Sequence, residues 1–346
     1  MSDHDVPISP RRVLIIKPSA IGDIVHALPV LPRLKKRWPD AKISWMVNAA
    51  FSDLVRNHPL VDEVILFERN RYARGWYNPA VFAEMLTFTR DLQRREFDIA
   101  IDLQGLFRSA WITLASGAKL RVGFSNAREG APLFYNQLVD CSWENDHAVE
   151  RYLKIATALG CDPADPVEFV LAVDEVDREY VRGLIPQNLR YAVLCPGANW
   201  ETKRWPAEHF AELAQQLEQK HGLKSVVAGS AADAKLAEQI GAAFNLAGKT
   251  NLRQIVALME RAELVVANDT GPMHIAAALG RPLVSPYGPT NAIRTGPYGR
   301  MDSVIALPLP CEPCYSRSCT HRSCLTWLKT DPVLELAERQ MNGKNP

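Results

Sequence analysis

Short apolar runs alternate with stretches of helical periodicity along most of the chain. In the first half, apolar runs of strand length occur at residues 13–16, 42–47, 63–67, 98–103 and 121–124. Between and after them, residues 80–95 and 147–160 repeat apolar side chains at three- and four-residue intervals, as an amphipathic helix does. Alternating strand and helix signals are typical of βα units built around parallel sheets.

The alternation starts again after a weakly periodic segment, residues 161–190, which contains three prolines and several acids and which we interpret as a linker. Beyond it, strands are predicted at residues 191–195, 224–229, 263–267 and 282–287, and helices at 207–222 and 252–261. The sequence therefore predicts an α/β protein with two Rossmann-like, doubly wound domains, residues 1–172 and 173–331, facing each other across a cleft. A last helix at 332–341, in the tail 332–346, closes the chain and could cross back to the first domain.

Two prolines interrupt the helical pattern that begins near Ile24. Pro29 and Pro32 each lack a backbone donor and crowd the preceding turn. The sequence predicts a kink or a break there.

Composition and charge narrow the class of protein. The 346 residues are 47% hydrophobic and 23% charged, as in a globular protein, and the net charge of +1 does not favour a nucleic-acid partner. The first residues carry acids and prolines without an apolar core, and no apolar run is long enough to span a bilayer. We therefore expect a cytoplasmic protein.

Two turns after predicted strands in the second half carry the features of a phosphate site. Residues 268–280 turn at Thr270 and Gly271 into a helix of small residues, whose free amides and dipole favour an anion. A second glycine-rich turn, residues 287–297, follows the next predicted strand. One such turn would be explained by a helix cap, but two on adjacent strands favour ligand binding.

A third strand-to-helix loop, residues 195–206, carries Lys203 and Arg204. A lysine there could neutralise a diphosphate and the charge that develops on a leaving group, although two solvated cations at a helix start are an alternative. No loop matches the dinucleotide-binding fingerprint or the P-loop. The Asp-x-Asp motif at Asp3 and Asp5 lies in the polar N-terminal tail, so a metal-bridged diphosphate is disfavoured.

Four of the seven cysteines crowd into one short segment that also contains His321: Cys311, Cys314, Cys319 and Cys324. Four thiols this close could hold a structural zinc ion or an iron–sulfur cluster. Their spacing departs from two paired C-x-x-C knuckles, so reduced thiols or a redox disulfide stay open as alternatives.

Five stretches together resemble the lipopolysaccharide heptosyltransferase family, glycosyltransferase family 9. They are KPSAIGD (17–23), DLQGLFRS (102–109), HAVER (147–151), KRWP (203–206) and NDTGPMHIAAALG (268–280). They occur in the family's order across nearly the whole chain, and the stretches at 102–109, 132–136 and 147–151 are most similar to the family's heptosyltransferase I branch.

The resemblance implies a GT-B architecture in which the first domain binds the acceptor and the second binds a nucleotide sugar, typically ADP-heptose. It implies an inverting reaction that needs no metal and no cofactor. It assigns the catalytic base to Asp23, which could otherwise be a first-turn acid favoured by the helix dipole. It places the leaving diphosphate on Lys203. The donor-binding candidates are Ser19, Gly22, Lys203, Arg204, Asp269, Thr270, Gly271, Pro272, His274, Gly288 and Thr290.

The implied acceptor is the inner core of a lipopolysaccharide precursor, with Kdo or heptose residues, at the inner face of the inner membrane. Arginines interleaved with aromatic residues in a predicted loop suit an anionic sugar or a phosphorylated lipid head group. The acceptor-binding candidates are Arg69, Arg71, Arg74, Gln104 and Arg128.

Two other functions are compatible with the same features. One is a different enzyme on the same two-domain plan, such as a nucleotide-sugar epimerase or a transferase of another sugar. The other is a module that binds a nucleotide sugar without turnover, because a fold alone does not establish an activity.

Overall fold

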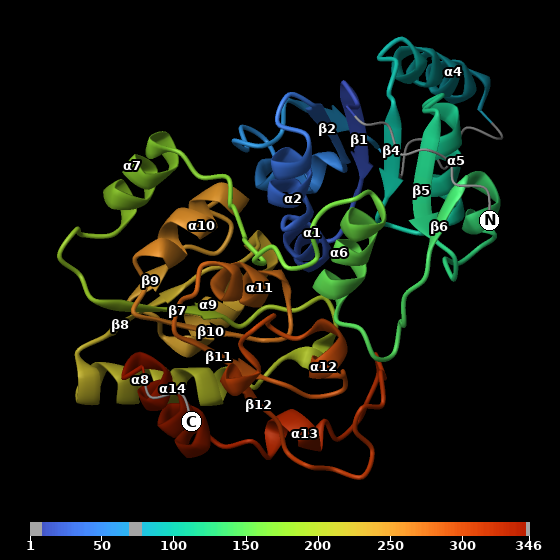
Figure 1. Ribbon diagram of the computed structural model, residues 1–346. Helices are drawn as coiled ribbons and strands as arrows, with labels where there is room; N and C mark the ends of the chain where they lie inside the picture. Colours follow the sequence, from blue (N-terminus) through green and yellow to red (C-terminus); the bar gives the residue numbers. More distant parts are fainter. Residues whose placement is uncertain (1–8, 69–77, 344–346) are drawn as a thin grey trace. The chain divides into compact units, whose positions relative to one another are not determined.

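The computed structural model describes residues 9–68 and 78–343 and divides into two compact units, residues 1–172 and 173–346 (Figure 1). In the first unit, the described strands form a parallel sheet in the order β3-β2-β1-β4-β5-β6. They are β1 (Arg12–Ile16), β2 (Lys42–Val47), β3 (Glu63–Leu66), β4 (Ile99–Asp102), β5 (Leu120–Phe124) and β6 (Gln137–Val139). The α-helices are α1 (Ile21–Ala27), α2 (Val30–Arg37), α4 (Pro79–Gln93), α5 (Phe107–Ala115) and α6 (Ala148–Ala158).

The second unit contains another parallel sheet, in the order β12-β11-β10-β7-β8-β9. Its strands are β7 (Tyr191–Cys195), β8 (Lys224–Val227), β9 (Phe244–Asn245), β10 (Leu264–Ala267), β11 (Leu283–Pro286) and β12 (Val304–Ile305). Its α-helices are α7 (Glu175–Leu184), α8 (Ala207–His221), α9 (Ala234–Ile240), α10 (Leu252–Glu260), α11 (Gly271–Ala278), α12 (Ala292–Thr295), α13 (Ser323–Thr326) and α14 (Thr330–Met341).

Both sheets follow the same winding, since the first strand of each unit lies at the centre and the chain then moves outward in both directions. In this strand order the direction of winding reverses between β1 and β4 in the first unit and between β7 and β10 in the second. Open α/β sheets bind ligands at the carboxyl ends of the strands that flank such a switch point. The topology thus marks one position in each unit, after β1 and β4 and after β7 and β10.

The central strands are apolar because helices cover them. Val13 to Ile16 of β1 are fully buried, and every residue of β7 is buried. Ile16 pairs with Asp102 of β4, so the carboxyl ends of these two strands are in register. At the corresponding place in the second unit, Cys195 pairs with Ala267 of β10.

The structure confirms the predicted α/β class and the predicted break near Pro29. Helix α1 ends at Ala27, and Pro29 is the N-cap residue of α2. Sequence reasoning missed α5, the edge strands β6, β9 and β12, and α7, which lies inside the predicted linker. For α14 the sequence left open a return to the first domain, but its apolar residues pack into the core of the second unit with α8 and β10. Within the described residues, no helix combines the length and apolar character needed to cross a membrane.

A buried polar contact ties β4 to the segment after β5. The Tyr135 hydroxyl donates to Oδ2 of Asp102 at 2.7 Å, and the ring lies where a side chain at position 123 would otherwise be. An added Cβ on Gly123 would lie 2.3 Å from Cε2 of Tyr135. Glycine is therefore required for Tyr135 to reach Asp102.

We predict that Gly123→Ala lowers the free energy of unfolding by about 1–3 kcal/mol, because the new methyl group displaces the Tyr135 ring in a packed site. Urea denaturation followed by circular dichroism measures the change. Gly183→Ala is the matched control, since no atom lies within 4 Å of its added Cβ and alanine is the better helix former. Equal unfolding midpoints for the two variants would contradict this packing.

Candidate active site

A buried lysine follows β1 at the switch point of the first unit. Lys17 is 2% exposed, and its ammonium donates to the Leu103 carbonyl at 3.3 Å and lies 5.1 Å from the centroid of the Tyr152 ring. Burial by itself would lower the pKa of Lys17, but the carboxylate of Asp23, together with Tyr152 and Asp102, raises it above its usual value. Lys17 is therefore a fixed cation inside the unit.

Asp23 lies one loop further along, in the first turn of α1. Its Oδ2 accepts the Ala20 amide at 3.2 Å and lies 3.8 Å from the Lys17 ammonium, while 43% of the side chain is exposed. One carboxylate oxygen thus contacts an amide and an ammonium of the protein, and the group as a whole reaches solvent. A carboxylate that is both oriented and accessible meets the geometric requirement for a general base.

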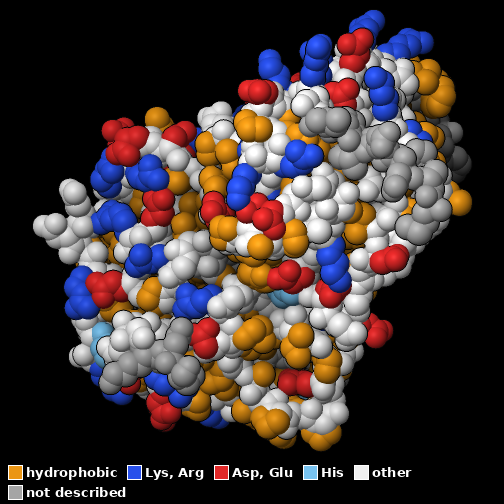
Figure 2. Space-filling view, viewed as in Figure 1, with side chains coloured by type: hydrophobic (Ala, Val, Ile, Leu, Met, Phe, Trp, Pro, Cys, Tyr) orange, Lys and Arg blue, Asp and Glu red, His pale blue; other side chains and the backbone are white. Residues whose placement is uncertain are grey.

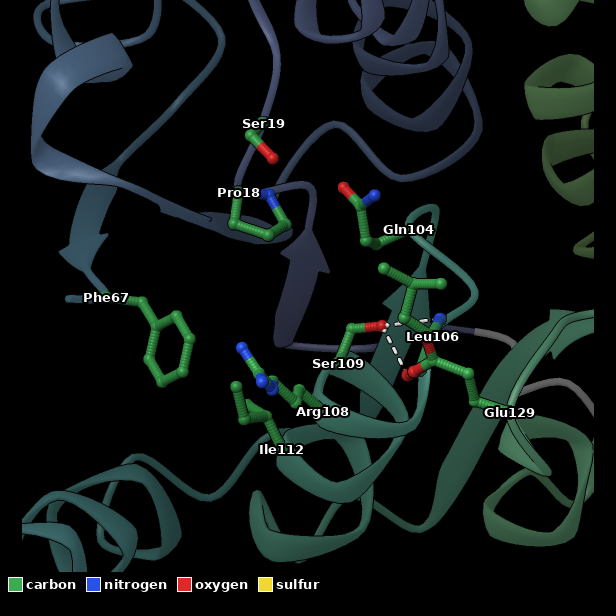
Figure 3. Close-up of a pocket in the computed structure, with 9 residues that line it drawn as sticks. All are labelled: Pro18, Ser19, Phe67, Gln104, Leu106, Arg108, Ser109, Ile112 and Glu129. Atoms are coloured by element: carbon green, nitrogen blue, oxygen red, sulfur yellow. Dashed lines mark hydrogen bonds between the residues drawn. The ribbon is translucent and has the colours of Figure 1, made fainter. Parts of the chain in front are cut away.

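The carboxyl ends of β1 and β4 also border a pocket in the first unit (Figure 3). Ser19 comes from the loop after β1 and Gln104 from the loop after β4, whereas Arg108 and Ile112 come from α5. The Oε1 atom of Gln104 is buried without a hydrogen-bond partner among the described residues. The lining residues are Pro18, Ser19, Phe67, Gln104, Leu106, Arg108, Ser109, Ile112 and Glu129.

The loop that carries Gln104 is held in place by hydrogen bonds to a buried aspartate. Oδ1 of the fully buried Asp102 accepts the amides of Gln104 at 2.8 Å and Gly105 at 3.0 Å. Burial raises the pKa of Asp102, and the hydrogen bonds from Tyr135, Ser109 and these amides oppose that rise. The backbone of Arg128 lies against the same loop, because its amide donates to the Gly105 carbonyl at 3.1 Å.

In the second unit a nearly buried carboxylate joins three loops. Asp269, which follows β10, is 6% exposed, and its Oδ2 lies 2.6 Å from the Lys203 ammonium. The same oxygen accepts the Thr290 hydroxyl at 2.5 Å, and Oδ1 accepts the Tyr287 hydroxyl at 3.2 Å. Burial, with the adjacent Asp269 carboxylate, raises the pKa of Tyr287 well above its usual value, so this hydroxyl stays protonated and donates.

Asn268, next to this carboxylate, fixes the loop that carries Lys203. Its side chain is fully buried, accepts the Trp205 amide at 3.1 Å and donates to the Pro196 carbonyl at 2.8 Å. Both ends of the loop between β7 and α8 are therefore held by one amide side chain. This loop and the loop after β10 cannot move independently while these bonds persist.

Helix α11 begins directly after Asp269. Thr270 is its N-cap residue, but its hydroxyl donates to the Asn268 carbonyl at 3.1 Å instead of capping the helix. Pro272 has no amide hydrogen to leave unpaired in the first turn. His274 is buried within the helix, at 7% exposure. The start of α11 thus combines a positive helix end with the neighbouring Lys203, which suits an anion.

The structure brings together five of the eleven sequence-predicted donor residues and gives two others different contacts. Lys203, Asp269, Thr270, Gly271 and Thr290 come together at the carboxyl edge of the second sheet. Arg204 instead donates two hydrogen bonds to the Ala198 carbonyl, at 2.9 and 2.7 Å. Gly288 packs against Cys324, since a Cβ there would lie 3.1 Å from its Sγ.

Other predicted site residues lie elsewhere in the chain. Ser19, Gly22 and Asp23 belong to the first unit. Arg69, Arg71 and Arg74 lie outside the described residues.

The cysteine cluster gains no support as a metal site. All four thiols are free, and within residues 9–68 and 78–343 no group of three or more His, Cys, Asp or Glu side chains is arranged to hold a metal ion. Burial and the neighbouring Glu312 carboxylate raise the pKa of Cys324 to about 11.

Several site residues carried no recognisable signal in the sequence. Lys17 and Asn268 stand in two of the family motifs, but the motifs assign no role to either residue. Arg108, Tyr152 and Tyr287 were not singled out. The positions of Lys17 and Asn268 directly after predicted strands could have indicated proximity to the site, but the burial and partners of all five residues depend on contacts far apart in the sequence.

Comparison with known proteins agrees with this arrangement. The model of glycosyltransferase family 9 (heptosyltransferase) matches residues 85–324. Lipopolysaccharide heptosyltransferase 1 of Pseudomonas aeruginosa is 32% identical over 318 residues, 90% of this chain and 88% of that protein. Lipopolysaccharide heptosyltransferase 2 of Escherichia coli is 32% identical and covers 86% of this chain and 88% of its own length.

Solved structures extend the similarity to three dimensions. The structure of E. coli heptosyltransferase WaaC with ADP is 29% identical and aligns with a TM-score of 0.78 over 95% of this chain and 99% of that chain. The same enzyme with ADP-2-deoxy-2-fluoro heptose gives 0.77 at the same identity and coverage. The family match and the similarity to these structures show a glycosyltransferase of the GT-B class. The chain belongs to glycosyltransferase family 9, the heptosyltransferase family.

We predict that Asn268→Ala lowers the free energy of unfolding by about 2–4 kcal/mol, because the Trp205 amide and the Pro196 carbonyl lose their buried partner. Urea denaturation gives the value. Asn291→Ala, which removes only a surface cap from the Ile293 amide, is the control and should cost about 0.5–1 kcal/mol. A loss in Asn268→Ala no larger than in the control would contradict the assigned role.

Proposed function

We propose that the chain transfers heptose from ADP-heptose to the inner core of a lipopolysaccharide precursor, with inversion at the anomeric carbon and without a metal ion. Family membership supports heptosyl transfer, and the WaaC structures with ADP and an ADP-heptose analogue support a nucleotide-sugar donor. The observation that carries the mechanism is the pair of charged sites: an oriented, half-exposed Asp23 in one unit and Lys203 held by Asp269 in the other.

Asp23 is the base in this scheme. The acceptor hydroxyl gives its proton to the Asp23 carboxylate while its oxygen forms a bond to the anomeric carbon. The bond from that carbon to the diphosphate oxygen breaks at the same time, and the electron pair leaves with ADP. Attack on the face opposite the leaving group inverts the configuration. Lys17 orients Asp23 and does not take part in the proton transfer.

The departing diphosphate is stabilised by groups that are already in place. Lys203 is held by Asp269, and the amides at the start of α11 follow Thr270. Charge that develops on the leaving oxygen then meets a fixed cation and a positive helix end, without reorganisation during the reaction. This arrangement supplies the charge that a divalent metal provides in other nucleotide-sugar enzymes.

The acceptor belongs to the pocket of the first unit. Arg108 and Gln104 offer a cation and an amide beside the apolar side chains of Phe67, Leu106 and Ile112. Arg128 stays a further acceptor candidate, since its backbone is hydrogen-bonded to the loop that carries Gln104. An anionic sugar with an apolar ring face fits these groups. Three further acceptor contacts stay predictions: Arg69, Arg71 and Arg74. Because the proposed acceptor is linked to a lipid, the reaction would take place at the inner face of the inner membrane.

The reaction requires that Asp23 reach a sugar whose diphosphate rests on the second unit. Closure around both substrates would exclude water and so limit hydrolysis of the donor. Binding of both substrates would supply the free energy for closure, because each contributes contacts to one unit.

We predict that Asp23→Asn lowers kcat by about 10²–10⁴-fold and leaves ADP affinity within about twofold, because the amide keeps the shape of the side chain but cannot accept a proton. Transfer from ADP-heptose to a truncated lipopolysaccharide acceptor is followed by mass spectrometry, with and without a chelator. Asp40→Asn, an exposed acid after α2, is the control. Native turnover in Asp23→Asn would refute the base, and loss of transfer in chelator would refute the metal-free mechanism.

We predict that Arg108→Gln raises KM for the acceptor roughly tenfold or more, because it removes a charge-assisted contact to the acceptor anion. ADP affinity should not change, since the donor binds the second unit. Arg90→Gln on α4, which removes the same charge from a residue that does not line the pocket, serves as the control. An unchanged acceptor KM would exclude Arg108 from the acceptor site.

A further inference from the structure

The cysteine segment, residues 311–324, is a motif that the proposed chemistry does not use. We call it the cysteine loop. Its four thiols and His321 line one pocket together with Thr202 and Pro289. Those two residues come from the loops after β7 and β11, which also carry Lys203 and Thr290. The cysteine loop therefore contacts both segments that complete the site around Asp269.

The contacts to the loop after β11 combine a backbone hydrogen bond with close packing. The Tyr315 amide donates to the Pro289 carbonyl at 2.7 Å. Gly288 lies against the cysteine loop and helix α13, because a Cβ on it would lie 3.1 Å from both Sγ of Cys324 and Cγ of Leu325. A larger residue at position 288 would push these segments apart.

The contacts to the loop after β7 involve side chains. The Thr202 hydroxyl donates to the Ser316 carbonyl at 2.8 Å, and the guanidinium of Arg322 forms an ion pair with Glu201 at 3.2 Å. Both bonds hold residues that directly precede Lys203. The cysteine loop thus fixes the segment on which this lysine stands.

Trp200 provides the most specific connection. The Lys203 ammonium lies 4.8 Å from the centroid of the Trp200 ring, and the guanidinium carbon of Arg317 lies 4.7 Å from the same centroid. Both distances are within the range of cation–π attraction, for which tryptophan is the best ring. Arg317 belongs to the cysteine loop, so a single aromatic ring connects that loop to Lys203.

We propose that Arg317 is a positioning residue for the donor site, which acts on Lys203 through the Trp200 ring. This inference rests on the proposed role of Lys203 in holding the donor diphosphate. The stem of lysine has several rotatable bonds, so its ammonium needs contacts that limit its position. Asp269 restrains it on one side by charge, and the Trp200 ring restrains it by its π-face. Arg317 fixes the ring.

The alternative is that Arg317 contacts the diphosphate itself as a second cation. The two roles differ in how the effects of substitutions combine. If Arg317 acts through Lys203, its removal has no further effect once Lys203 is gone. If it binds the diphosphate directly, the two losses add, because independent contacts contribute independently to the binding free energy.

The experiment measures ADP affinity of the full chain by isothermal titration calorimetry. Lys203→Met should weaken ADP binding roughly tenfold to a hundredfold. Arg317→Gln and Trp200→Ala should each weaken it roughly two- to fivefold, whereas Trp200→Phe and Arg317→Lys, which keep a ring and a cation, should restore most of the affinity. The double variant Arg317→Gln with Lys203→Met should bind ADP as weakly as Lys203→Met alone.

Arg339→Gln on α14 is the matched control, since it removes one exposed positive charge from the same unit and should leave ADP affinity unchanged. Additive losses in the double variant would overturn the positioning role in favour of direct contact. If Lys203→Met weakens ADP binding but Arg317→Gln binds ADP as tightly as Arg339→Gln, the inference about Arg317 is overturned and the proposed role of Lys203 is not. Unchanged affinity in Lys203→Met would instead refute the proposed donor role on which the inference rests.

Discussion

The carboxylate of Asp269 is the contact on which the organisation of the second unit depends. It is almost completely buried and receives an ammonium, a threonine hydroxyl and a tyrosine hydroxyl, each from a different position along the chain. A buried charge is tolerated only when it is paired and hydrogen-bonded, so removal of any one donor leaves the Asp269 carboxylate with part of its desolvation cost uncompensated. The loops after β7, β10 and β11 therefore have a shared reason to hold one arrangement.

The first unit also contains an ion pair with one buried member, but there the buried charge is positive. There the buried group is a cation, Lys17, and its carboxylate partner Asp23 keeps nearly half of its surface in solvent. A base must exchange its proton with a substrate, whereas a group that neutralises a leaving diphosphate must keep its charge throughout. In the proposed mechanism each unit thus buries the partner of the group that acts, and the same strand order places both pairs at a switch point.

The fold was largely predictable because buried parallel strands are continuous apolar runs, and those of β1, β2, β7 and β10 were found nearly to the residue. Short edge strands such as β9 and β12 were missed because two residues give no periodic signal. The break at Pro29 was predictable because proline acts locally. Asp23, Lys203 and Thr270 were recognised because they stand in motifs, whereas the burial of Lys17 and the contacts of Arg108 arise from residues far apart in the chain.

Asp269 itself shows the limit of reasoning from a motif. The resemblance implied that Asp269 binds the donor, but the structure gives its two oxygens to Lys203, Thr290 and Tyr287. An acid that follows a strand at the switch point can contact a ligand or organise the groups that do, and its type and spacing are the same in both cases. Only the identity of its neighbours separates the two roles, because a carboxylate with three donors in place is already satisfied before a ligand arrives. Preorganisation of this kind keeps Lys203 in position in the free protein, so that under the proposed role of Lys203 the donor does not have to supply the free energy of ordering it.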